Sequence, residues 1–197
     1  MSEDAMTSGI NTRFVEFIID LLDEKNRNNG KRKPGSSAAS AALKRADNSK
    51  TEYQSWEYLA QAERVGVRIN IENDFERLTY TTIASAMAKA KVEKNGSVRI
   101  GEAIARCYDI TVDSKGQREF DSQAKMKLRR LLACDTTEEV CRVLRPLFSL
   151  IASKANVQLD YAALLKDLLY FHSDNKNVKS RWAQNFYHFK LKDEDNE

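Results

Sequence analysis

The chain has 197 residues, of which 42% are hydrophobic and 31% are charged, an ordinary balance for a soluble globular protein. Its 32 Lys and Arg against 29 Asp and Glu leave a net charge of only +3, which by itself points to no partner. No run approaches the roughly 20 apolar residues that cross a bilayer, and the N-terminus lacks the basic and apolar regions of a signal peptide. We therefore expect a cytoplasmic protein that does not contact a membrane.

Charge is unevenly distributed along the chain. The stretches 123–134 and 175–192 contain Lys and Arg but no Asp or Glu, and the stretch 25–50 is rich in basic residues with a single acid, Asp47. Acids collect before residue 25, between residues 47 and 76, and in the tail 193–197. Segregation of this kind predicts a basic surface that meets a polyanion, although the whole chain is nearly neutral.

Helical periodicity runs through almost the whole chain. Only two Pro and seven Gly interrupt apolar residues that recur at spacings of three and four. In the N-terminal half we expect a helix that Asn11 or Thr12 caps, a flexible basic loop at 25–36, and helices over about 37–46, 50–63, 75–90 and 100–108. Within the 50–63 helix, Tyr53 and Trp56 are expected in the core.

The C-terminal half begins after a turn at 113–116. We expect a helix that Asp121 caps, a second helix from residue 136 that Pro146 kinks, a third over about 161–171 after Asp160 as its cap, and a fourth over about 178–189. Trp182 and Phe186 belong to the apolar stripe of the last helix. The chain is therefore predicted to be all-α, with about eight or nine helices.

The turn at 113–116 suggests a division into two small helical bundles. The predicted boundaries are a disordered N-terminus at 1–10, an N-terminal bundle at 11–112, a C-terminal bundle at 118–190 and an acidic tail at 191–197.

Cysteine and histidine usage favours neither a metal site nor a disulfide framework. Cys107, Cys134 and Cys141 are irregularly spaced, and His172 and His188 are the only histidines. We expect buried reduced thiols and no metal or cofactor. A nucleophilic cysteine assisted by one of the histidines stays the alternative.

Six segments, in this order and spacing, carry a resemblance to a known family: ALKRA at 42–46, SVRIGEAIA at 97–105, LRRLLACD at 128–135, LRPL at 144–147, LDYAALLKDL at 159–168 and VKSRWAQNFY at 178–187. Together they make the chain similar, from about residue 14 to residue 189, to the small CasB-type subunit of type I-E CRISPR interference (Cascade) complexes. The departures are an RKPG insertion at 32–35, the stretch 65–73 and the acidic tail.

The resemblance implies a non-catalytic, cytoplasmic protein of antiviral defence, built from two helical bundles. Two copies of such a subunit pack head to tail in a crRNA-guided complex, beside a large subunit and a row of repeated backbone subunits. There they contact the phosphate backbones of crRNA and target DNA and stabilise the R-loop. Because the guide RNA reads the sequence, the subunit itself needs phosphate contacts and no base-specific contacts.

Basic residues on the outer arcs of the predicted helices are the candidates for phosphate contact: Lys44, Arg45, Lys125, Arg129, Arg130, Arg142, Arg145, Lys179 and Arg181. Each could instead be a solvated residue or a local ion-pair partner, as Arg142 with Glu138 or Arg145 with Glu139. For the set as a whole, the acid-free stretches favour nucleic-acid binding, because they contain no Asp or Glu that could neutralise the basic residues locally.

Other functions stay open at this point. A metal-dependent nuclease would need acids that converge near the basic face. A sequence-specific regulator would need a recognition helix, and no helix-turn-helix pattern is visible. A stand-alone helical nucleic-acid-binding protein, or a structural spacer whose basic patches dock on acidic neighbours, would share the same charge pattern.

Overall fold

The structure is a computed structural model that describes residues 3–23, 36–48, 50–112 and 114–189. The basic loop expected at 25–36, apart from Ser36, and the acidic tail lie outside these residues. The described residues form the helices α1 (Glu3–Leu22), α2 (Ser36–Arg45), α3 (Trp56–Gln61), α4 (Asp74–Ala90), α5 (Ile100–Ala105), α6 (Ser122–Leu132), α7 (Thr137–Lys154) and α8 (Tyr161–Tyr187). Two short 3-10 helices, η1 (Glu52–Ser55) and η2 (Ala62–Val65), flank α3. The all-α prediction is confirmed.

Helix α1 begins earlier than predicted. It starts at Glu3, so residues 3–10, which were expected to be disordered, are helical, and Asn11 and Thr12 lie inside the helix instead of capping it. Asn11 is buried. The prediction started the apolar stripe at Phe14, but Ile10, four residues earlier and so on the same helical face, already packs against the core.

The segment 50–63 is not the single helix that was predicted. It is divided into η1, α3 and η2, and its 3-10 turns hold about three residues each instead of 3.6. This change of period rotates the side chains away from the positions that an α-helical pattern assigns. Tyr53 and Trp56, predicted in the core, are 59% and 38% exposed, while Leu59 and Ala62 are buried.

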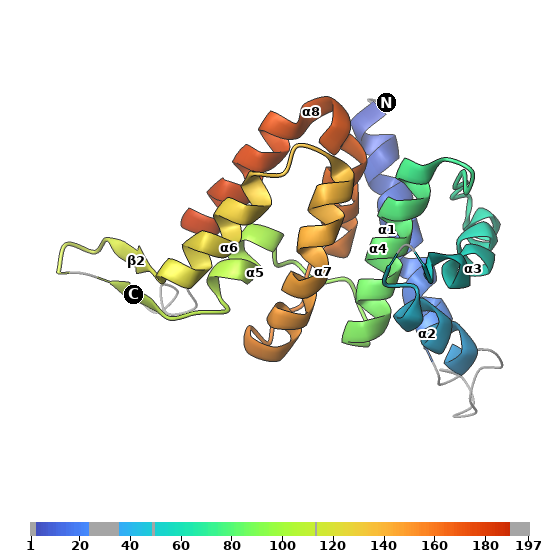
Figure 1. Cartoon of the computed structure of the whole chain (residues 1–197), viewed down its shortest axis with the longest axis horizontal. Coiled ribbons are helices and arrows are strands. Elements are labelled where there is room, and N and C mark those ends of the chain that lie inside the picture. The colour runs from blue at the N-terminus through green and yellow to red at the C-terminus, as the bar shows by residue number, and fades with distance from the viewer. Residues whose placement is uncertain (1–2, 24–35, 49, 113, 190–197) are drawn as a thin grey trace.

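Helix α4 contains the longest uninterrupted buried stretch of the described residues. Its cap, the Asn73 side chain, accepts hydrogen bonds from the backbone nitrogens of Phe75 and Glu76, and residues 79–88 are buried without interruption. A helix that is buried on every side must lie inside the molecule. Accordingly α4 packs against α1 and α2 on one side and α7 and α8 on the other (Figure 1).

The caps predicted in the C-terminal half are confirmed. Asp121 accepts from the Gln123 backbone nitrogen and Asp160 from that of Ala163. At the start of α7, Thr136 and Glu139 form a reciprocal capping box. Helix α7 runs without interruption through Pro146 to Lys154.

The last two predicted helices are one bent helix. Helix α8 runs from residue 161 to residue 187, with non-helical backbone angles at Asp174 (φ −141°, ψ 40°). Asp167, before the bend, accepts hydrogen bonds at 2.7 Å from both the Arg181 guanidinium and the Trp182 indole nitrogen, after it. Fourteen residues of straight helix would separate these groups by about 21 Å. The bend therefore folds α8 back on itself, and the Phe171 and Trp182 rings stack across it at 5.7 Å.

A β-hairpin was not predicted. Strands β1 (Ile110–Val112) and β2 (Arg118–Phe120) pair antiparallel, Ile110 opposite Phe120, where the sequence analysis expected only a turn. Figure 1 shows the hairpin projecting from the helical body. Strands of three residues are too short for an alternating pattern to be visible. Phe120 anchors the hairpin, since its ring contacts that of Phe186 at 4.9 Å.

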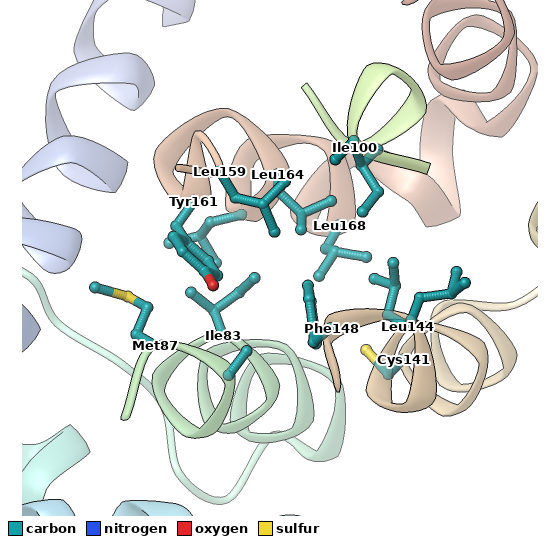
Figure 2. Packing of buried hydrophobic residues seen from close by; sticks show 14 of the residues in the cluster. Ile83, Met87, Ile100, Cys141, Leu144, Phe148, Leu159, Tyr161, Leu164 and Leu168 are labelled. Carbon is teal, nitrogen blue, oxygen red and sulfur yellow. The ribbon is translucent and has the colours of Figure 1, made fainter. Parts of the chain in front are cut away.

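One hydrophobic core runs through both halves of the chain. Figure 2 shows Ile83 and Met87 of α4 meeting Phe148 of α7 and Tyr161 of α8. Helix α5, which lies N-terminal to the predicted boundary at 112–118, packs against α6, α7 and α8. The division into two bundles stays a prediction.

The three cysteines are free and buried, as predicted. Burial raises the pKa of the Cys107 and Cys141 thiols to about 11. A thiol with so high a pKa is almost entirely protonated near neutral pH, which is unfavourable for a nucleophile.

Replacing Asp167 tests the bend of α8. In Asp167→Ala the buried Trp182 N–H loses its acceptor, and we expect the free energy of unfolding to fall by about 1–3 kcal/mol. Asp167→Asn keeps a side-chain oxygen that can accept from the indole nitrogen, so its free energy of unfolding should fall less. Urea unfolding followed by circular dichroism measures both. Equal stability of Asp167→Ala and the parent chain would show that these bonds do not hold the bend.

Gly101 tests the contact between α5 and α8. A Cβ there would lie 2.0 Å from the backbone oxygen of Trp182, which cannot rotate away. We expect Gly101→Ala to destabilise the fold by about 1–3 kcal/mol or more, as overpacking does. The matched control is Gly9→Ala, a helical position with no atom within 4 Å of the new Cβ. It should be neutral or stabilising by up to about 1 kcal/mol. Similar losses in the two variants would contradict the close packing of α5 on α8.

Candidate nucleic-acid interface

The strongest basic surface of the described residues is the outer face of α6. Ala124, Leu128 and Leu131 point inward, and the helix packs against α5, α7 and α8. Its cations occupy the rest of the circumference. Arg129 and Arg130 are exposed, and Lys125 and Lys127 are half-buried. None of the four forms an ion pair with an acid in the described ranges, so their charges are available to a ligand.

The cationic face continues into the corner between α6 and α7. There the Lys179 ammonium group of α8 binds the Asp135 carboxylate at 3.1 Å and lies 5.7 Å from the centre of the Phe171 ring. The pKa of the Cys134 thiol is raised, first by burial and then by Glu139. The charges of Lys179 and Arg130 oppose this rise, so both cations lie close to the corner. Lys179 at this corner already has an acidic partner, Asp135.

The two arginines of α7 do not behave alike. Arg142 is exposed and pairs with Glu138 at 2.9 Å, which is the local alternative considered from the sequence. Arg145 is half-buried, and its Nε is shielded from solvent without a hydrogen-bond partner in the described residues. The alternative pair of Arg145 with Glu139 does not form in the described residues, and Glu139 accepts instead from the backbone nitrogens of Asp135 and Thr136. Arg142 is thus exposed, whereas Arg145 is only partly so.

Arg181 is exposed, with 46% of its side chain accessible, but it is paired within the protein. Its guanidinium pairs at 2.7 Å with Asp167, whose side chain is only 14% exposed. The stretch 175–192 contains no acid, yet its two candidate cations are neutralised by Asp135 and Asp167, which come from elsewhere in the chain. For α8 the argument from missing local acids therefore fails.

The candidates of α2 lie far from the others. Helix α2 packs against α1, α4 and η1, and Figure 1 shows it at the opposite end of the molecule from the hairpin and α6. The Arg45 Nε donates to the Gln54 side chain at 2.7 Å, and Lys44 is half-buried. The structure therefore separates the two candidates of α2 from the seven of α6, α7 and α8.

The described ranges hold no cluster of three or more His, Cys, Asp or Glu side chains that could bind a metal ion. None of their helices combines the length and apolar character that crossing a bilayer requires.

Comparison with known proteins identifies the family. The sequence model of the CRISPR-associated protein Cse2 family matches residues 39–187. No curated protein sequence matches the chain.

Solved structures share the fold. CasB from Thermus thermophilus is similar with a TM-score of 0.60 and 21% identity, covering 87% of this chain and 96% of that one. CasB from Thermobifida fusca is similar with a TM-score of 0.64 and 17% identity, covering 92% and 97%. A chain of a CRISPR RNA-guided surveillance complex gives a TM-score of 0.56 and 21% identity, covering 91% and 92%.

The family match covers most of the chain, and both CasB structures are spanned almost completely. The resemblance to a CasB-type subunit that the sequence suggested is thus confirmed by the family model and by the fold. This protein belongs to the CRISPR-associated Cse2 family and is a CasB-type subunit.

Proposed function

We propose that this protein is the non-catalytic small subunit of a crRNA-guided type I-E interference complex, where it binds nucleic-acid backbones without sequence preference. The family membership and the likeness to a chain of an RNA-guided surveillance complex support the assembly. The observation that carries the binding role is the row of Lys and Arg on α6 that lacks acidic partners among the described residues. A solvated face would more often intersperse both signs of charge.

Phosphate contact is the chemistry that the α6 face supports. Eleven helical residues span about 16 Å, which is comparable to about five base steps of a duplex strand at 3.4 Å each. Arg129 and Arg130 can each donate two hydrogen bonds to one phosphate, while Lys125 and Lys127 supply point charges. Such contacts fix position and release counterions, and they carry no sequence information.

Arg142 and Lys179 can extend this surface if a phosphate displaces their acidic partners, Glu138 and Asp135. Exposed ion pairs such as Arg142–Glu138 contribute about 0–1 kcal/mol, so a phosphate can replace the carboxylate at little cost. Arg181 is different, because its partner Asp167 also accepts from Trp182 in the bend of α8. Breaking that pair would disturb the fold, and we assign Arg181 a structural role.

Within the complex, the subunit would stabilise the R-loop by holding the target duplex and the displaced strand as base pairing with the guide proceeds. One basic face of this size binds weakly alone, and tethering it in an assembly with a second copy and the repeated backbone subunits raises its effective concentration. A spacer without nucleic-acid contact is the second candidate, favoured by the internal pairing of Lys179 and Arg181.

Charge removal on α6 separates these functions. We expect Arg129→Ala with Arg130→Ala to weaken duplex DNA binding about equally for unrelated sequences. The slope of log affinity against log salt should become shallower by about 2, or 0.9 per lost phosphate contact. Arg142→Ala, which removes an exposed cation that is already paired, is the matched control and should change the slope less. An unchanged slope in the folded double variant would remove α6 from the proposed function and favour the spacer.

Co-purification tests the assembly. The tagged protein, isolated with its native neighbours, is expected to carry one repeat-derived RNA and large subunits in stoichiometric amounts. Recovery of the protein alone, or with assorted DNA, would support a stand-alone nucleic-acid-binding protein instead.

A further inference from the structure

Two aromatic side chains are exposed at the end of the molecule that is remote from α6. Tyr53 of η1 is 59% exposed and Trp56, the first residue of α3, is 38% exposed. The other tryptophan, Trp182, is 1% exposed. Tyr and Trp combine a large apolar ring with a polar group and are enriched at interfaces. We call Tyr53 and Trp56 the aromatic patch.

The Arg77 side chain holds the Trp56 ring in place. The Arg77 guanidinium lies 5.4 Å from the centre of the ring. Arg77 itself is fixed by an ion pair with Glu52 at 3.1 Å and a hydrogen bond to the Ile71 carbonyl oxygen at 2.8 Å. A ring that is fixed by a buried network and still exposed loses little conformational freedom when a flat ligand stacks on it.

Two cations belong to the segments next to the aromatic patch. Arg45 donates to the side chain of Gln54, the residue next to Tyr53, and Lys50 is exposed just before η1. Neither cation has an ion-pair partner in the described part of the chain.

The acids near this patch are largely occupied. Glu52 and Asp74 hold Arg77, and Asp47 pairs with Lys89. Glu57 is the exposed acid of α3 and accepts from Gln61. Exposed rings beside unpaired cations are the combination that single-stranded nucleic acids require, because stacking holds the bases and the cations hold the phosphates.

We infer that the aromatic patch is a second nucleic-acid site, a stacking platform for unpaired bases with Arg45 and Lys50 on the adjacent phosphates. This inference rests on the proposed function and adds a division of labour to it. Bases in a duplex cannot reach the rings, so the patch selects a single strand, whereas the α6 face binds backbone charge of either form. An apolar protein partner would gain nothing from the flanking cations.

Tryptophan fluorescence reports directly on this site. We expect an unlabelled oligo(dT) to quench the emission of the full-length protein, since a base that stacks on Trp56 quenches the indole. A duplex of the same length should quench much less. Trp182 is buried and supplies a constant background. In Trp56→Phe the remaining emission should not respond to oligo(dT), while the phenyl ring preserves most of the binding.

Affinity measurements with matched variants separate stacking from charge. Tyr53→Ala with Trp56→Ala should weaken oligo(dT) binding by about tenfold or more, with the salt slope unchanged. Arg45→Ala should instead make the slope shallower by about one contact. Val65→Ala, another exposed apolar residue of this segment, is the control and should have no effect. Circular dichroism confirms that each variant is folded.

The outcomes are distinguishable from failure of the proposed function. Loss of duplex binding in the α6 variants with no quenching by oligo(dT) would overturn the stacking platform alone. Equal oligo(dT) affinity of the parent chain and the double aromatic variant would overturn it as well. Quenching of Trp56 by a purified protein neighbour, with none by oligo(dT), would identify the patch as a protein contact and refute the inference.

Discussion

The contact of Asp167 with Trp182 and Arg181 is the interaction on which the rest of the fold depends. It ties the two arms of α8 together across the bend at Asp174. The first arm of the helix then supports the core that α4 and α7 complete (Figure 2). The second arm presents the backbone of Trp182 to Gly101, so that α5 can lie directly against it. Helix α6 packs on α5 and α8. The basic face is therefore positioned by a carboxylate that touches none of its residues.

The sequence patterns correctly predicted the features that depend on residues close together in the chain. The caps at Asp121 and Asp160 were correct because a cap depends on a side chain and the two or three backbone nitrogens that follow it. Trp182 and Phe186 were correctly placed in the core because the second arm of α8 is a regular helix. Tyr53 and Trp56 were misplaced because 3-10 turns interrupt the helical period there. The same interruption exposes the two rings, so the error and the inferred site have one cause.

The candidate site was harder to predict because charge segregation along the chain is not charge segregation in space. Residues 123–134 and 175–192 have the same sequence signature, a basic stretch without acids. Folding leaves α6 without acidic partners in the described residues and brings Asp135 and Asp167 to α8. These acids lie 44 and 14 residues away from their partners in the chain. Counting the acids within one sequence segment cannot detect ion pairs with acids from elsewhere in the chain.

Two separate surfaces on one continuous core have a physical consequence for an R-loop. Unwinding a duplex creates a paired and an unpaired strand at the same moment, and a single basic face would bind both by charge alone. Charge cannot discriminate between them, since each carries a phosphate per nucleotide. An exposed ring can, because only unpaired bases offer a free face for stacking. On the proposed function and the inferred stacking platform, a subunit with unpaired cations at α6 and fixed aromatic rings at η1 and α3 would bind the open state through one contact more than the closed state. By linkage, that extra contact would shift the equilibrium toward opening, without any base being read.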